Sequence, residues 1–315
     1  NLPYGGAKGG ITVDPSTLSL KELERLTRKF VDQIHDVIGP TRDIPGPDMN
    51  TNPQVMAWIM DQYSKYHGHA PAVVTGKPVE LYGSRGRETA TARGLLAVCR
   101  QILQDVGLPM QGMRFAVQGF GNVGSHVSRL FHDAGGLLVA VSDVHGGVQN
   151  PKGLDVPGLF EHVRRHGSVK DFGGGTACTN EEVLTADCDV MVPAALGGVV
   201  NKQIAKEVRA RIVLEGANAP CTPEADEIFE QRGVLVVPDI LANAGGVTVS
   251  YFEWVQNLQH VTWDEERVNG ELDRMMAEAY EKVGQISRSR KLPLRTSAYV
   301  LAIGRVGKAT VLRGI

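Results

Sequence analysis

The stretch that decides the fold runs from residue 114 to residue 124 and reads Arg-Phe-Ala-Val-Gln-Gly-Phe-Gly-Asn-Val-Gly. Its first five residues have the apolar character of a buried strand, and residues 122–134 follow with helical spacing. Gly119, Gly121 and Gly124 therefore occupy a strand–turn–helix unit, the context in which G-x-G-x-x-G predicts dinucleotide binding. The first glycine makes the tight turn, the second lets backbone approach a pyrophosphate, and the third lets helix and strand pack closely. A glycine-rich turn for another ligand is the alternative.

Residues beside this turn extend the predicted cofactor site. Asn122 and Val123 open the helix, whose free N–H groups and positive dipole end favour phosphate. Asp143 ends the next strand, where a carboxylate accepts hydrogen bonds from the adenosine ribose, unless it only solvates the strand end. The following residues, 144–146, include no Arg or Lys to meet a 2′-phosphate. NAD is therefore favoured over NADP, which is not excluded because Lys152 could supply that charge.

The rest of the chain alternates strands and helices, which predicts an α/β fold with a mostly parallel, doubly wound sheet of Rossmann type. The Ser19/Glu22 capping box starts a predicted helix that Gly39 ends. Beyond residue 243 the pattern is helical, with interruptions predicted at Gly284 and Pro293. The predicted strands are 114–118, 137–142, 190–192, 211–214 and 234–237, with a polar strand and loop at 41–52, and further helices are predicted at 54–66, 88–104 and 296–312.

The length of 315 residues is enough for two domains, each with its own core. We assign residues 1–81 to a substrate-binding domain of α/β type and residues 82–285 to the dinucleotide-binding domain. Residues 286–315 are predicted to form a C-terminal helix that returns to the substrate domain. Because the sequence opens without Met and runs straight into a glycine-rich turn, the substrate domain is expected to be present only in part.

Composition narrows the class of partner. The formal net charge of −2, without a basic run, argues against nucleic acid and anionic membranes and favours small molecules. The four cysteines form no C-x-x-C pair, and no apolar stretch approaches the roughly 20 residues of a membrane span. A cytoplasmic protein is expected. His67 and His69 form an H-x-H pair without a third ligand nearby in the sequence, so no metal site is predicted.

Two polar segments near the start carry candidate proton chemistry. Lys8 lies within a run of small residues, 5–10, where backbone and ligand can approach closely. Asp43 and Asp48 lie in a loop made stiff by prolines, 39–50. Taken alone, the lysine could be an ordinary loop cation and the aspartates could only form turns.

Several motifs, taken in order along nearly the whole chain, resemble the glutamate dehydrogenase branch of the Glu/Leu/Phe/Val dehydrogenases. They are residues 5–11, 43–50, 76–78 with 83–91, 119–124, 215–218 and 238–250. The resemblance implies reversible oxidative deamination of L-glutamate to 2-oxoglutarate and ammonia with NAD(P). It also implies a hexamer, which we expect to be a homo-oligomer.

By this resemblance Lys8 and Asp48 are the catalytic residues. A lysine desolvated in a closed site has a lowered pKa and exchanges protons near neutral pH. Lys8 would polarise the substrate carbonyl and activate water, and Asp48 would relay protons to and from the amino group. The family's other substrate-binding lysines are expected upstream of this sequence. Ala92 stands where the family usually has glycine.

The resemblance also assigns binding residues. Ser250 would donate a hydrogen bond to the substrate's side-chain carboxylate, and Asn243 would lie near nicotinamide and substrate. The full substrate set is Ser250, Gly246, Val247 and Asn243; the cofactor set is Arg87, Thr91, Gly119, Gly121, Asn122, Val123, Gly124, Asp143, Asn218 and Asn243. Thr91 and Ser250 could instead bond to the preceding helical turn, and the asparagines could be turn residues.

Three alternatives stay open. A leucine- or phenylalanine-type dehydrogenase would need an apolar pocket, in which Ser250 would lack a partner. A catalytically silent regulatory subunit would keep the fold but would not need Lys8 and Asp48. A dinucleotide-sensing module would need neither residue.

Overall fold

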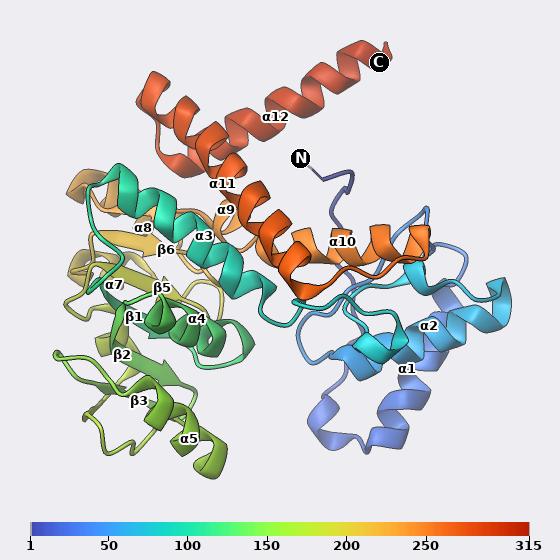
Figure 1. Cartoon of the computed structure of the whole chain (residues 1–315), viewed down its shortest axis with the longest axis horizontal. Helices are drawn as coiled ribbons and strands as arrows, with labels where there is room; N and C mark the ends of the chain where they lie inside the picture. Colours follow the sequence, from blue (N-terminus) through green and yellow to red (C-terminus); the bar gives the residue numbers. More distant parts are fainter. Residues whose placement is uncertain (1, 315) are drawn as a thin grey trace. The chain divides into compact units, whose positions relative to one another are not determined.

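The computed structural model describes residues 2–314, which form two compact units (Figure 1). Unit 1 comprises Asn1–Ala90 and Gly246–Glu271, and unit 2 comprises Thr91–Gly245 and Leu272–Ile315. Each unit has its own apolar core, as the two-domain prediction required.

Unit 2 contains one seven-stranded sheet in the order β4-β3-β2-β1-β5-β6-β7. Five strands are parallel: β1 (Arg114–Gln118), β2 (Leu137–Asp143), β5 (Val190–Pro193), β6 (Ile212–Leu214) and β7 (Leu235–Val237). Strand β1 is central, with Phe115 in register with Leu138 on one side and Val190 on the other. The predicted α/β class and parallel sheet are confirmed. Two further strands were not predicted: β3 (Gly146–Gln149) pairs antiparallel with β2, and β4 (Thr176–Cys178) pairs antiparallel with β3 and ends the sheet on that side.

Helices pack around this sheet. Helix α4 (Asn122–Asp133) lies against β1 and β2, so its N-terminus meets the carboxyl end of the central strand. In parallel sheets the ligand-binding loops gather at that end of the strands. The other helices of this part of the chain are α3 (Ala90–Asp105), α5 (Val156–His166), α6 (Asn180–Leu184), α7 (Lys202–Glu207), α8 (Pro223–Arg232), α9 (Asp239–Ala242), α11 (Glu265–Arg290) and α12 (Leu294–Arg313).

Unit 1 is built mainly from α1 (Leu20–Ile34), α2 (Pro53–His67) and α10 (Gly245–Gln259), joined by the short 3-10 turns η1 (Pro15–Thr17), η2 (Pro71–Val73) and η3 (Val79–Leu81). Helices α1 and α2 pack on each other (Figure 1). The Ser19/Glu22 capping box is confirmed. The predicted strand within 41–52 is wrong: its residues make only an isolated bridge between Ile38 and Asp43, since proline cannot donate to a ladder.

The units differ from the predicted domain boundaries in three places. Residues 82–90, predicted to lie in the dinucleotide domain, belong to unit 1. Residues 246–271, predicted to lie in the dinucleotide domain, belong to unit 1 because α10 carries a buried carboxylate that bonds to residues 76 and 77. Helix α12, predicted to return to the substrate domain, belongs to unit 2, where Arg295 pairs with Glu215 and Asp226. Gly284 does not interrupt α11, which runs from Glu265 to Arg290, whereas Pro293 does separate α11 from α12. No described helix is both long and apolar enough to cross a membrane.

Candidate active site

The predicted catalytic pair comes together in unit 1. Lys8 Nζ donates a short hydrogen bond to Asp48 Oδ2, although forty residues separate the two in the chain. The bond from Lys8 lowers the pKa of Asp48, and the N–H of Met49, which donates to Oδ1, adds to the effect. The Lys8 side chain is 77% exposed, so the desolvation expected from the resemblance is not provided by the protein in this structure.

The loop that carries Asp48 is fixed from both sides. Thr51 Oγ1 accepts a hydrogen bond from the Asp48 N–H at 2.7 Å and donates to the Asp48 carbonyl at 2.8 Å. The N–H of Thr75 donates to the carbonyl of Pro45. Gly76 has a φ of +79°, and a Cβ there would lie 2.6 Å from the ring of Pro47, so only glycine fits. The position of Asp48 thus depends on the segment at residues 75–76.

That segment is anchored by a buried ion pair that the sequence analysis missed. Lys77 Nζ lies 2.6 Å from Glu253 Oε1 on α10, and neither side chain has any exposed surface. Glu253 also accepts from the N–H groups of Gly76 and Lys77, and Lys77 Nζ donates to the carbonyl of Val74. Burial lowers the pKa of Lys77, and the attraction of Glu253 works in the opposite direction. The only feature of the sequence that pointed to this ion pair was the motif at residues 76–78, and that motif does not indicate that Glu253 is the partner of Lys77.

Ser250 lies one helical turn before Glu253 on the same helix and is 8% exposed. Its Oγ accepts a hydrogen bond from Arg87 Nε at 3.1 Å, which leaves its hydroxyl proton free for another acceptor. Burial lowers the pKa of Arg87, against the attraction of Glu253. Arg87, which was predicted to contact the cofactor, is thus hydrogen-bonded to Ser250, the serine predicted to bind the substrate. Gly246 is buried and Val247 is exposed in the first turn of the same helix.

The glycine-rich turn of unit 2 has the predicted geometry. Gly119 has a φ of +100°, and a Cβ on Gly124 would lie 1.9 Å from the Gly119 carbonyl oxygen, so the third glycine is needed for close packing. A Cβ on Gly121 would meet nothing within 4 Å. Gly121 is the N-cap of α4 without a side-chain cap, and Asn122 is exposed. The helix therefore presents uncapped N–H groups to an open approach, as a dinucleotide pyrophosphate requires.

Asp143 ends β2, as predicted, but both of its oxygens are engaged locally. Oδ1 accepts from the N–H of His145 and Oδ2 from the N–H of Val169, each at 2.8 Å. Burial raises the pKa of Asp143, but these donors outweigh it and hold the pKa below its ordinary value. Asp143 therefore ties together two loops, and a ribose hydroxyl would have to share its oxygens.

Two other predicted cofactor residues meet in unit 2. Asn243 Nδ2 donates to Asn218 Oδ1 at 2.8 Å, which joins the loop after β6 to the C-cap of α9. Thr91 lies in the first turn of α3 and is half-buried. Ala92, the next residue of α3, is 1% exposed.

Comparison with known families decides the relationship. The family described as Glutamate/Leucine/Phenylalanine/Valine dehydrogenase matches residues 83–314, and the Glu/Leu/Phe/Val dehydrogenase dimerisation domain matches residues 1–65. The chain belongs to the Glu/Leu/Phe/Val dehydrogenase family. A glutamate dehydrogenase from Thermotoga maritima is 53% identical across 100% of this chain and 76% of its own length.

Solved structures of the same family agree. A hetero-hexameric glutamate dehydrogenase from Thermus thermophilus, in a leucine-bound form, is 41% identical, with a TM-score of 0.94 over 99% of this chain and 74% of its own. Glutamate dehydrogenase from Peptoniphilus asaccharolyticus is 37% identical, with a TM-score of 0.85 over 99% of this chain and 75% of its own.

Membership of the Glu/Leu/Phe/Val dehydrogenase family implies a nicotinamide dinucleotide, and the residues present fit one. The open space at Gly121 and the uncapped N–H groups of α4 would receive the pyrophosphate. The paired Asn218 and Asn243 offer amide groups in neighbouring loops.

Proposed function

We propose that this Glu/Leu/Phe/Val dehydrogenase catalyses the reversible oxidative deamination of L-glutamate to 2-oxoglutarate and ammonia. The observation that carries the proposal is the direct pairing of Lys8 with Asp48. A sensing module or a silent subunit would not need an ammonium and a carboxylate held together. The similarity to the glutamate dehydrogenase of Thermotoga maritima supports the choice of substrate.

In this proposal Lys8 and Asp48 move protons. Substrate covering the exposed Lys8 side chain would remove water from it and bring Lys8 against the reacting carbonyl. Neutral or charged, Lys8 would polarise the substrate carbonyl and orient water against the imine. The hydrogen bond from Lys8 lowers the pKa of Asp48, so Asp48 is ionised before it relays a proton from the amino group.

Substrate selection rests on the pair formed by Ser250 and Arg87. Because Arg87 donates to the Ser250 oxygen, the serine proton is left to donate to a substrate carboxylate. An adjacent guanidinium adds positive charge in a site largely shielded from water. A purely apolar substrate side chain would leave the Ser250 hydroxyl proton without an acceptor, which argues against leucine or phenylalanine. Gly246, Val247 and Asn243 are proposed to complete the substrate site.

We propose that the nicotinamide cofactor is NAD, with NADP as the alternative. The bound nicotinamide supplies the hydride acceptor, and the protein's part is to hold its phosphates at Gly119–Gly124 and to position the ring. We propose that three further residues contact the cofactor: Arg87, Thr91 and Asn218. Exposed Val144 and His145 offer no fixed cation to a 2′-phosphate. Asp143, whose carboxylate is ionised, would repel such a phosphate.

A hexamer is proposed for the assembly, and the match of residues 1–65 to a dimerisation domain supports an oligomer. We propose identical subunits in the cytoplasm. The hetero-hexameric relative from Thermus thermophilus makes a mixed assembly the competing arrangement.

The test compares wild type with Lys8→Ala for glutamate-dependent reduction of NAD and of NADP, with leucine as a competing substrate. Lys21→Ala is the matched control, since Lys21 is an exposed lysine of α1. The expected result is glutamate turnover that collapses in Lys8→Ala, with dinucleotide binding kept, and persists in Lys21→Ala. A wild type that binds dinucleotide but turns over no amino acid would favour the hypothesis of a catalytically silent regulatory subunit. Faster turnover of leucine than of glutamate would contradict glutamate as the substrate.

A further inference from the structure

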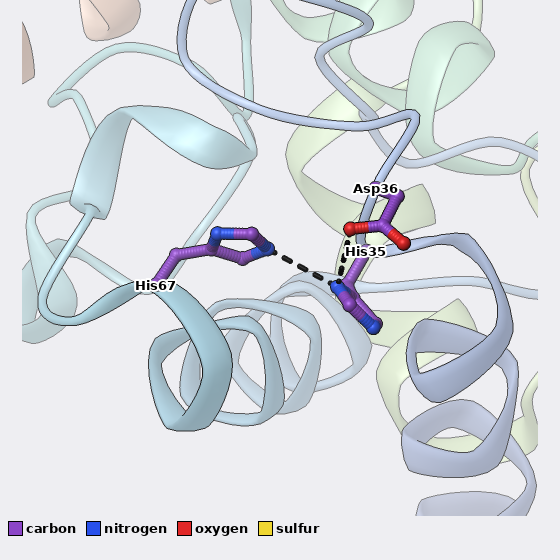
Figure 2. A group of neighbouring side chains, drawn as sticks. All are labelled: His35, Asp36 and His67. Carbon is purple, nitrogen blue, oxygen red and sulfur yellow. Dashed lines mark hydrogen bonds and ion pairs between the residues drawn. The ribbon is translucent and has the colours of Figure 1, made fainter.

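Three side chains with metal-binding atoms meet where α1 and α2 end in unit 1. His35 is the C-cap of α1, Asp36 follows it, and His67 is the last residue of α2. His35 Nδ1 lies 3.1 Å from His67 Nε2 and 3.2 Å from Asp36 Oδ1. Figure 2 shows both interactions converging on the same ring nitrogen. The pairing of His67 with His35 was missed in the sequence, where only His69 stood near it.

The spacing suits a divalent metal better than a hydrogen-bond network. One ring nitrogen carries at most one proton, so His35 Nδ1 cannot make a linear bond to His67 and to Asp36 at once. Zinc bonds of about 2.0–2.1 Å in tetrahedral geometry place ligand atoms about 3.3 Å apart. The two measured separations are close to that value, and all three atoms lie within 4.8 Å of one another. The Asp36 side chain is 83% exposed and can rotate to close the third separation.

The two imidazole rings are held in place by aromatic neighbours. The His35 ring stacks on Tyr66 with centroids 4.0 Å apart, and the His67 ring stacks on Tyr63 at 4.4 Å. Tyr66 is itself fixed by a hydrogen bond from its hydroxyl to Asp32. The nitrogen atoms are therefore preorganised, which reduces the ordering that metal binding would otherwise require.

Charge near the cluster also favours a cation. The negative ends of the α1 and α2 dipoles both lie at these residues. The opposing charge is Arg42, whose guanidinium donates to the backbone carbonyl of Asp36 and leaves the carboxylate oxygens available.

We propose that His35, Asp36 and His67 form a binding site for a divalent transition metal of the zinc class. Two imidazole nitrogens and one carboxylate oxygen are ligands that zinc accepts, and water would fill the fourth position. The metal would link the ends of α1 and α2, away from the Lys8–Asp48 pair in sequence. The site is independent of the proposed dehydrogenase reaction.

Equilibrium dialysis against Zn²⁺, together with the visible absorption of bound Co²⁺, tests the site in the whole protein. Wild type is expected to bind Zn²⁺ with a Co²⁺ spectrum typical of nitrogen and oxygen ligands. His67→Gln should weaken this binding by roughly tenfold or more, and Asp36→Asn should weaken it less. His69→Gln is the matched control, because His69 lies two residues away and makes an edge-to-face contact with Tyr82 instead. It should bind as wild type does.

A second readout is thermal stability. Since binding to the folded state alone raises stability, Zn²⁺ should raise the Tm of wild type and of His69→Gln but not of His67→Gln. Circular dichroism without metal would establish that His67→Gln is folded. Equal Zn²⁺ binding by wild type and His67→Gln, or no binding by folded wild type, would overturn the proposal and leave a hydrogen-bonded cluster.

Discussion

Replacing Glu253 with glutamine should strongly destabilise unit 1. The carboxylate accepts hydrogen bonds from the N–H groups of Gly76 and Lys77 and from Lys77 Nζ, through both of its oxygens. Glutamine has one acceptor oxygen and presents an NH₂ group at the other position. At least one buried donor would lose its partner, and the buried ammonium of Lys77 would lose its counter-charge.

The size of the effect follows from the complete burial of the pair. Removing one partner of a buried ion pair costs about 3–5 kcal/mol, because the remaining charge stays in a poorly solvated site. Removing one partner of an exposed ion pair costs about 0–1 kcal/mol, because water replaces the lost partner. The pair of Glu24 and Arg28 on α1 is partly exposed, so Glu24→Gln is the matched control in the same unit.

Tryptophan fluorescence reports unit 1 selectively. All three tryptophans of the chain, Trp58, Trp254 and Trp263, belong to this unit. Urea unfolding followed by tryptophan emission should therefore shift to a lower midpoint in Glu253→Gln, whereas Glu24→Gln should remain close to wild type.

A double variant separates charge from packing. Lys77→Met with Glu253→Gln removes the buried ammonium that Glu253→Gln alone leaves without a counter-charge. The double variant should be more stable than Glu253→Gln alone. A loss below about 1 kcal/mol in Glu253→Gln would refute the reasoning, because a fully buried pair cannot behave like a surface pair.

Three further predictions concern unit 2. Gly124→Ala should abolish binding in a NADH fluorescence titration, since its Cβ would overlap the Gly119 carbonyl, whereas Gly121→Ala should fold normally and only weaken binding. Arg295→Met should cost about 3 kcal/mol of stability by calorimetry, because it leaves the fully buried carboxylate of Glu215 unpaired. Burial raises the pKa of Asp143, but backbone donors outweigh it and keep the pKa below its ordinary value. The stability that this carboxylate contributes is therefore present above the unfolded pKa of about 3.9 and lost as pH falls through the lower folded value. The difference in urea midpoint between wild type and Asp143→Asn, by circular dichroism, should be constant from about pH 7 to pH 5 and shrink below about pH 4.

Features governed by neighbouring residues were predictable from sequence. Strand β1 was predicted with its observed ends, because an apolar run bounded by Gly119 has few other solutions. The capping box of Ser19 and Glu22 also formed, since each residue bonds the other's backbone within one turn. Helix α1 nevertheless ends at Ile34 and not near Gly39: residues 35–37 form a turn and Ile38 makes an isolated bridge with Asp43.

Features that depend on distant partners were not predictable in the same way. Strands β3 and β4 are short and of mixed polarity, and they form only because β3 pairs with the outer side of β2 and β4 then pairs with β3. The partner of Lys77 lies 176 residues away, so no local pattern could identify Glu253. The resemblance brought Lys8 and Asp48 together as a hypothesis, and their contact in the structure is a separate observation.

Helix α10 connects stability with the proposed chemistry. Ser250 and Glu253 are three residues apart and so lie on one face of the helix. Glu253 holds the backbone of Gly76, and Gly76 has room for no Cβ because Pro47 packs against it. Asp48 directly follows Pro47 in the chain. A substitution at Glu253 is therefore expected to shift Asp48, through the Glu253–Gly76 hydrogen bond and the Gly76–Pro47 contact. It is also expected to shift Ser250, which lies one turn away on the same helix. Loss of activity in such variants would have to be separated from unfolding, by tryptophan emission under the assay conditions, before a catalytic role was assigned to Glu253.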